Sequence, residues 1–199
     1  MNGMDSMDSM DSVDSMDSVD SVDSVDKRRR VLVAGVGNVL HGDDGFGVIV
    51  AQRLALHPAL PADVRVLEVG IGGISLVQEL FDGYDVLIIV DAVERKSIPG
   101  TLYLLEQQVP DLTLWSPEQR QEFLADMHMA TPSRTLILAK ALGILPPAVY
   151  LFGCQPTSYD DLVIGLSAPV EQAVERSIKR LLSELQELTM PTNMDAGAN

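Results

Sequence analysis

The chain has 199 residues, of which 46% are hydrophobic and 5% aromatic, and a formal net charge of −15. This length and apolar content fit one soluble domain with its own core. No apolar run approaches the roughly 20 residues of a membrane span, and the N-terminus lacks the apolar segment of a secretory signal. We therefore expect a cytoplasmic protein that binds neither membrane nor nucleic acid.

Much of the negative charge comes from an N-terminal repeat. From Met4 to Asp26 the chain repeats Met/Val-Asp-Ser, with an aspartate at every third position. A period of three fits neither an amphipathic helix nor a strand, and these residues bury too little apolar surface to fold. We predict a disordered tail over residues 1–27; weak cation binding along an extended tail is the alternative. The folded domain is then expected over residues 28–189, beginning in a short basic run, and residues 190–199 are expected to fray.

The segment from Arg30 to Leu54 carries the first functional pattern. Val31 to Ala34 is predicted to form a buried strand, a glycine-rich turn with two aspartates follows, and helical spacing returns at Val48. Turns of this kind lie at the carboxyl ends of strands, where open α/β sheets bind ligands. Asp44 is therefore a candidate binding residue.

A dinucleotide site is the first alternative for this turn. Gly35 and Gly37 follow the strand, but the third glycine of the fingerprint is replaced by Leu40. The region from Leu54 to Leu60 has no carboxylate to bind a ribose, and two aspartates in the turn would repel a pyrophosphate. A nucleotide-binding regulator is thus kept only as a lesser hypothesis.

Further elements alternate along the chain. Ser116-Pro117 and Thr131-Pro132 have the residues that begin helices, with Gln119 completing a capping box after Ser116. Strands are expected over residues 64–69, 85–91, 101–105 and 148–154, and helices over 74–81, 132–142 and 167–188. Because parallel strands need crossover connections, this order predicts an α/β three-layer sandwich with a mostly parallel central sheet and helices on both faces.

Three polar residues are expected at one edge of that sheet. Asp44 follows the first strand, Asp91 ends the strand at Val86 to Val90, and His128 precedes a later helix. Two carboxylates and an imidazole suit zinc, nickel or manganese better than calcium. Each also has a structural explanation, since Asp44 could organise the turn, Asp91 could cap a helix and His128 could bond to backbone.

Other polar candidates are weaker. Cys154 is the sole cysteine, which excludes an internal disulfide, and it ends an apolar run in which burial is expected. Asp43 could pair with Asp44 as an acid dyad, but neighbours in sequence usually point apart. His41 is expected to be an exposed loop residue. We see no serine or cysteine nucleophile with a histidine partner.

The motifs together resemble those of a known family. VLVAGVGNVLHGDDGFGV, then LIIVDAV with Pro99-Gly100 behind it, and a histidine before a helix are similar to the nickel-iron hydrogenase maturation endopeptidases, from about Val31 to Leu188. The resemblance implies an endopeptidase that removes a C-terminal extension from the hydrogenase large-subunit precursor after nickel insertion.

The resemblance also implies a site and a partner. The family's metal-binding residues correspond to Asp44, Asp91 and His128, which would act both as metal ligands and as catalytic residues. The divalent metal would be nickel carried by the precursor, a transient partner, and the protein itself would be a monomer. A non-catalytic nickel-sensing or escort module on the same fold is the alternative.

The chain departs from the family pattern in two places. Many relatives have an Asp-Gly-Gly-Thr-like turn after the second strand, whereas this chain has Val69-Gly70-Ile71-Gly72-Gly73. No acidic role can be transferred to that turn. The aspartate-serine repeat has no counterpart in the pattern and is assigned no catalytic role.

Overall fold

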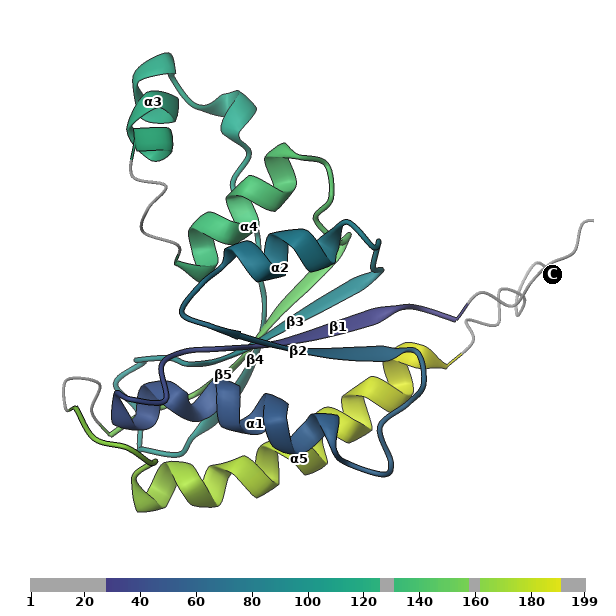
Figure 1. The fold of residues 1–199 in the computed structure, drawn as a ribbon, viewed down its shortest axis with the longest axis vertical. Coiled ribbons are helices and arrows are strands. Elements are labelled where there is room, and N and C mark those ends of the chain that lie inside the picture. The colour runs from purple at the N-terminus through teal and green to yellow at the C-terminus, as the bar shows by residue number, and fades with distance from the viewer. Residues whose placement is uncertain (1–27, 126–130, 158–161, 191–199) are drawn as a thin grey trace, which may run out of the picture.

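The computed structural model describes residues 28–125, 131–157 and 162–190. Five strands form one sheet in the order β2-β1-β3-β5-β4, in which only β4 runs antiparallel to its neighbour (Figure 1). The strands are β1 (Val31–Val36), β2 (Val64–Gly70), β3 (Val86–Ala92), β4 (Leu102–Glu106) and β5 (Ala148–Cys154). The α-helices are α1 (Phe46–Ala55), α2 (Ile74–Leu80), α3 (Pro117–Ala125), α4 (Pro132–Ala141) and α5 (Ala168–Thr189), and the two 3-10 turns are η1 (Gly42–Gly45) and η2 (Leu112–Leu114).

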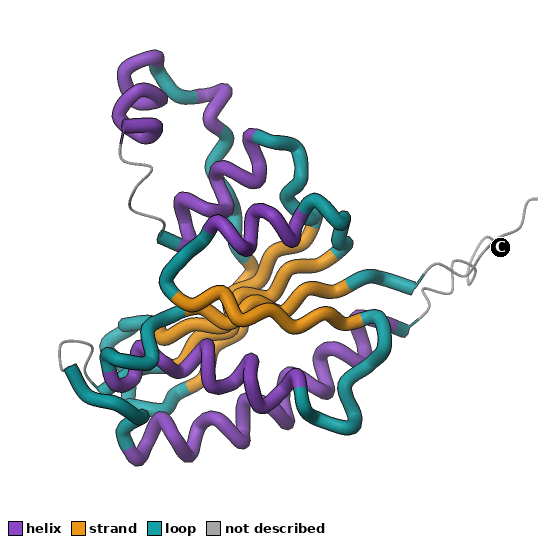
Figure 2. The backbone as a smooth tube through the Cα atoms, viewed as in Figure 1, coloured by secondary structure: helices purple, strands orange, loops and turns teal. Residues whose placement is uncertain are grey.

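Helices cover both faces of the sheet, as Figure 2 shows, so the predicted three-layer α/β sandwich is confirmed. Helices α1 and α5 lie on one face, and α2 and α4 lie on the other. Strand β1 is buried along its whole length and divides its side chains between the two layers. Val31 and Val33 pack with α1 and α5, whereas Leu32 and Ala34 pack with α2 and α4. Burial on both faces explains why the central strands are continuous apolar runs.

Local sequence signals place two helix starts as predicted. The Ser116 hydroxyl accepts a hydrogen bond from the Gln119 N–H, and the Gln119 side chain accepts one from the Ser116 N–H, which completes the capping box. Thr131 caps α4 through the Arg134 N–H, with Pro132 in its first turn. The described helices include none with the length and apolarity of a membrane span.

The main difference from expectation is at the end of β1, which extends two residues further than predicted. Gly35 stays in the strand because it pairs with both neighbours, Glu68 of β2 and Val90 of β3. Helix α1 then packs very closely over these strands. A methyl group on Gly47 would overlap the carbonyl oxygens of Val36 and Val90, so glycine is required there. This contact sets η1, directly before α1, beside the ends of β1 and β3.

Candidate functional site

The candidate site lies at the carboxyl edge, by which we mean the edge where the parallel strands β1, β2, β3 and β5 end. In the order β2-β1-β3, the chain leaves β1 toward β2 on one side of the sheet and leaves β3 toward the other side. The gap between β1 and β3 is therefore a topological switch point. Loops leave such a point in opposite directions and open a crevice between them. Asp44 follows β1 and Asp91 lies in β3, so the two candidates flank that crevice.

Asp44 is held by the turn that follows β1. Gly37 has a φ of 124°, and a side chain at this position would collide with the Asp44 carbonyl oxygen, so only glycine fits. Asn38 follows, and its backbone N–H donates to Asp44 Oδ2 at 2.8 Å. The Gly37 N–H donates to the Gly70 carbonyl, which ties the turn to the end of β2. Asp44 is half-buried and fixed in orientation by these contacts.

Asp91 lies in β3, one residue before the strand ends. Its Oδ1 accepts a hydrogen bond from the Ala92 N–H at 2.8 Å. Burial raises the pKa of the Asp91 carboxyl to about 7, and the negative charge of Asp44 adds to the rise, while the Ala92 hydrogen bond opposes it. Asp44 and Asp91 therefore repel each other when both are ionised. A cation between them would remove that repulsion, and carboxylate oxygens are common ligands of divalent metals.

The third predicted ligand, His128, lies outside the described residues and stays a prediction. Within residues 28–125, 131–157 and 162–190, no group of three His, Cys, Asp or Glu side chains is placed to hold a metal ion. The structure thus brings two of the three predicted residues, Asp44 and Asp91, to the same switch point. The predicted tail over residues 1–27 also lies outside the described part of the chain.

Asp43 has a different role from its neighbour. Its side chain is only 2% exposed, and it accepts hydrogen bonds from the Thr157 N–H, the Ser167 N–H and the Ser167 hydroxyl at 2.7, 2.7 and 2.9 Å. Asp43 therefore joins η1 to the segment before α5 and does not form a dyad with Asp44. Sequence reasoning missed this role, since no local pattern links residues so far apart.

Gln155 is a second structural residue that the sequence did not reveal. Its buried side-chain oxygen accepts from the backbone N–H groups of Arg95 and Ser97, and its side-chain nitrogen donates to Glu94. These bonds fasten the loop between β3 and β4 to the end of β5. Lys96 in that loop has a φ of 56°, a rare backbone conformation for a residue with a side chain.

Cys154 is fully buried at the end of β5, as predicted. Burial raises the pKa of its thiol to about 12, the charge of Asp43 adds to the rise, and Arg176 opposes it. Because the thiolate is the nucleophilic form, Cys154 is unsuited to nucleophilic catalysis.

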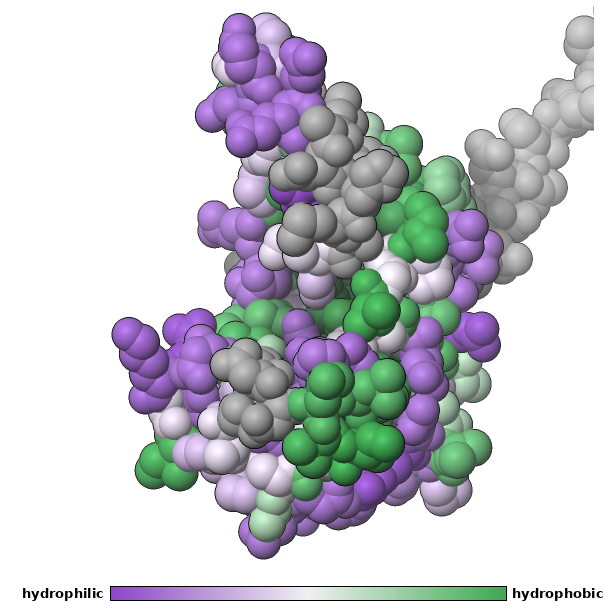
Figure 3. Space-filling model, turned by 60° about the vertical axis from the view of Figure 1, so that its left-hand side comes forward, coloured by the Kyte–Doolittle hydropathy of each residue, from purple (hydrophilic) through white to green (hydrophobic). Residues whose placement is uncertain are grey.

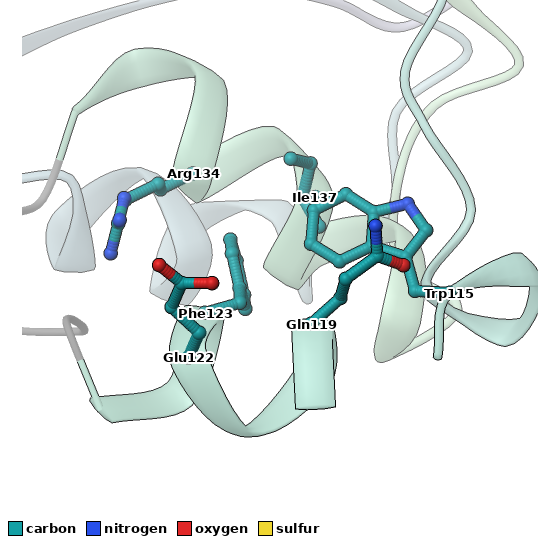
Figure 4. A pocket seen from close by; sticks show the side chains of 6 residues that line it. All are labelled: Trp115, Gln119, Glu122, Phe123, Arg134 and Ile137. Carbon is teal, nitrogen blue, oxygen red and sulfur yellow. The ribbon is translucent and has the colours of Figure 1, made fainter. Parts of the chain in front are cut away.

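A cavity of about 330 Å³ lies away from the carboxylates, between α3 and α4 (Figure 4). Trp115 and Phe123 meet edge to face in its wall with ring centroids 5.6 Å apart, and the Arg134 guanidinium lies 5.5 Å from the Phe123 ring centroid. Neither Asp44 nor Asp91 lines this cavity. The Trp115 contact joins α3 to the segment before it, and the Arg134 contact joins α3 to α4.

Comparison with known proteins identifies similar sequences. The model of a family described as hydrogenase maturation protease matches residues 48–184, a range that includes Asp91 and His128 and begins just after Asp44. The chain is 33% identical over 160 residues to hydrogenase expression/formation protein HupD of Rhodobacter capsulatus, covering 80% of this chain and 73% of that protein. It is 34% identical over 160 residues to hydrogenase 2 maturation protease of Escherichia coli, covering 79% and 92%.

Solved structures show the same similarity. Hydrogenase 2 maturation peptidase from a Thaumarchaeota archaeon is 35% identical, with a TM-score of 0.56 over 79% of this chain and 98% of that one. The hydrogenase maturating endopeptidase HybD from Escherichia coli is 30% identical, with a TM-score of 0.61 over 79% and 93%.

Proposed function

Because the chain belongs to the hydrogenase maturation protease family, we propose that it is an endopeptidase acting on the large-subunit precursor of a nickel-iron hydrogenase. It removes the C-terminal extension of that precursor after nickel has been inserted. Asp44, Asp91 and His128 recognise the nickel, which the precursor carries as part of the substrate. The protease acts as a monomer and binds its substrate transiently.

The observation that carries this proposal is the carboxylate pair at the switch point. Asp44 and Asp91 lie close enough for the charge of one to raise the pKa of the other, and each has a side-chain oxygen held by a single backbone N–H. The two carboxylates are thus fixed in orientation and repel each other when both are ionised. A divalent ion supplies the missing positive charge, so the presence of nickel in the precursor favours binding at the scissile region.

Nickel then serves as the signal that insertion is complete. A precursor without nickel brings no cation to Asp44 and Asp91, which continue to repel each other. A precursor with nickel relieves that repulsion, and the difference in affinity separates the two substrates. The buried thiol of Cys154 supports a reaction that does not use a cysteine nucleophile.

The experiment compares nickel-loaded and nickel-free large-subunit precursors from the same genome as this protein. Each is incubated with the protease, and loss of the C-terminal extension is measured by mass spectrometry. We expect cleavage of the nickel-loaded form only. Equal cleavage of both forms would contradict nickel recognition, and binding of the precursor without any cleavage would favour the escort alternative.

Site variants test the assigned residues. Asp44→Asn, Asp91→Asn and His128→Ala are each expected to abolish processing while the circular dichroism spectrum is retained. Asp82→Asn is the matched control, because Asp82 is an exposed aspartate in the turn between α2 and β3, at the opposite edge of the sheet. Full activity in all three site variants would refute the assignment.

A further inference from the structure

Exposed apolar side chains are concentrated around the candidate site. Within the described part of the chain, eight of the thirteen exposed large hydrophobic residues belong to the segments 39–40, 71–74, 98 and 162–164, which follow β1, β2, β3 and β5. We call the six most exposed of them the apolar collar: Leu40, Ile71, Ile74, Ile98, Leu162 and Ile164. In Figure 3 the left-hand side of Figure 1, where the carboxyl edge lies, is turned forward, and hydrophobic residues gather on this face.

The loops of the collar are fastened to the sheet by polar contacts. Asp43 holds Ser167, and the Gly42 N–H donates to the Val163 carbonyl at 2.7 Å, which fixes the segment 162–167 against η1. Gln155 fastens the loop of Ile98. The bond between the Gly37 N–H and the Gly70 carbonyl fixes the turn that precedes Ile71. These apolar side chains are thus held exposed by ordered backbone.

The collar loops lie at the same edge of the sheet as the carboxylate pair. Asp44 lies in η1 after β1, and Asp91 lies in β3; β1 and β3 are the two central strands of the group β2-β1-β3-β5, and the collar loops follow all four of these strands. A hollow of about 240 Å³ opens between η1 and the segment 163–167, and Ile164 and Leu166 are in its wall. A polypeptide that approaches the carboxyl edge between these loops meets exposed apolar side chains.

From this geometry we infer that the apolar collar binds the segment of the large-subunit precursor that carries the scissile bond, through apolar side chains of that segment. The inference rests on the proposed function for the identity of the occupant. Exposed apolar side chains gathered at one edge of a molecule are typical of an interaction site. The collar supplies affinity for the polypeptide, whereas the carboxylates respond to the metal, so affinity and nickel recognition are carried by separate groups.

The test uses an Ile98→Ser/Ile164→Ser double variant. Both side chains are highly exposed, at 79% and 83%, so the fold does not depend on them. Leu56→Ser is the matched control, because Leu56 is 87% exposed at the C-terminal end of α1, at the opposite edge of the sheet. The dissociation constant for the nickel-loaded precursor is measured by calorimetry, and KM and kcat are measured from the rate of processing.

We expect the double variant to weaken precursor binding and to raise KM about tenfold or more, as loss of two apolar contacts implies. kcat should change little, and the control should match the wild-type protein. An unchanged dissociation constant in the double variant, or an equal loss in the control, would refute the collar. The collar would also be refuted if sedimentation equilibrium showed a dimeric wild-type protein and a monomeric double variant, since a second copy of the chain would then occupy this surface.

The binding measurement separates this inference from the proposed function. If the wild-type protein cleaves the precursor and the double variant binds it equally well, the collar is refuted and the endopeptidase function stands. If the wild-type protein binds the precursor without cleaving it and the double variant binds at least tenfold more weakly, the endopeptidase function is refuted and the collar stands. Failure of the wild-type protein to bind the precursor refutes the collar.

Discussion

Asp43 and Ser167 are joined by two hydrogen bonds across 124 positions of sequence, since the Ser167 N–H and hydroxyl both donate to the Asp43 carboxylate. This link closes the domain, because it connects the turn after the first strand to the start of the last helix. The two adjacent aspartates therefore have different roles. Asp43 fixes the loop, and Asp44 is left to face the switch point.

Replacing Asp43 by asparagine should therefore destabilise the protein. An amide has one acceptor oxygen and turns its NH₂ group toward one of the N–H donors, so the expected loss is about 1–3 kcal/mol of the free energy of unfolding. Asp44→Asn is the matched variant, because its amide oxygen can still accept from the Asn38 N–H. Urea denaturation measures both. Equal stability of the two variants would contradict the role of Asp43.

Asp91 predicts a specific dependence of stability on pH in the metal-free protein. Its pKa is about 7 in the folded state and near the ordinary value of 3.8 in the unfolded state, so its ionisation is less favourable in the folded protein. Below about pH 4 Asp91 is protonated in both states and does not lower the free energy of unfolding. As the pH rises to 7, the unfolded state releases this proton more readily than the folded state, so the free energy of unfolding falls. Asparagine does not titrate. Relative to the wild-type protein, Asp91→Asn should gain up to about 4 kcal/mol between pH 4 and pH 8.

Chemical denaturation at several pH values, with a chelator present, measures this difference. Asp44→Asn provides a further check, because removal of the neighbouring charge should lower the Asp91 pKa only partly, burial being the larger cause. A stability difference between Asp91→Asn and wild type that does not change with pH would show that Asp91 titrates normally.

Cys154 should be unreactive in the native protein. The thiol is fully buried and its pKa is raised to about 12, so almost no thiolate is accessible to a reagent near neutral pH. Ellman's reagent should label the cysteine in urea and leave the native protein unlabelled. Cys154→Ala should retain processing activity. Rapid native labelling, or loss of processing with the fold intact, would reopen a role for the thiol.

Gly47 should be intolerant of even a methyl group. Alanine at this position would overlap the carbonyl oxygens of Val36 and Val90 and push α1 away from β1 and β3. We therefore expect the free energy of unfolding to fall by about 1–3 kcal/mol. Gly72→Ala is the control, because no atom lies near a Cβ added there and Gly72 is absent from the residues with positive φ. Thermal unfolding of both variants checks this, and comparable losses would show that the close packing of α1 is unimportant.

Helix starts and buried strands follow from local sequence, and the structure confirms them. The capping box of Ser116 and Gln119 uses atoms three residues apart, so its signal is complete within one turn of chain. The run from Val86 to Val90 is apolar throughout because both faces of the central sheet are covered. The position of Asp44 and Asp91 at one edge could be predicted for a related reason, since parallel strands all end on the same side.

The sequence by itself determined the elements, their alternation and the two carboxylates at the carboxyl edge, because these depend on periodicity and chain direction. Only the tertiary structure decided that Asp43 binds Ser167 and that Gln155 holds the loop after β3, because those partners are far apart in sequence. It likewise decided the pKa of Asp91, which depends on burial and on the charge of Asp44. Local sequence patterns do not specify contacts between residues far apart in the chain, and these groups meet only when the chain folds.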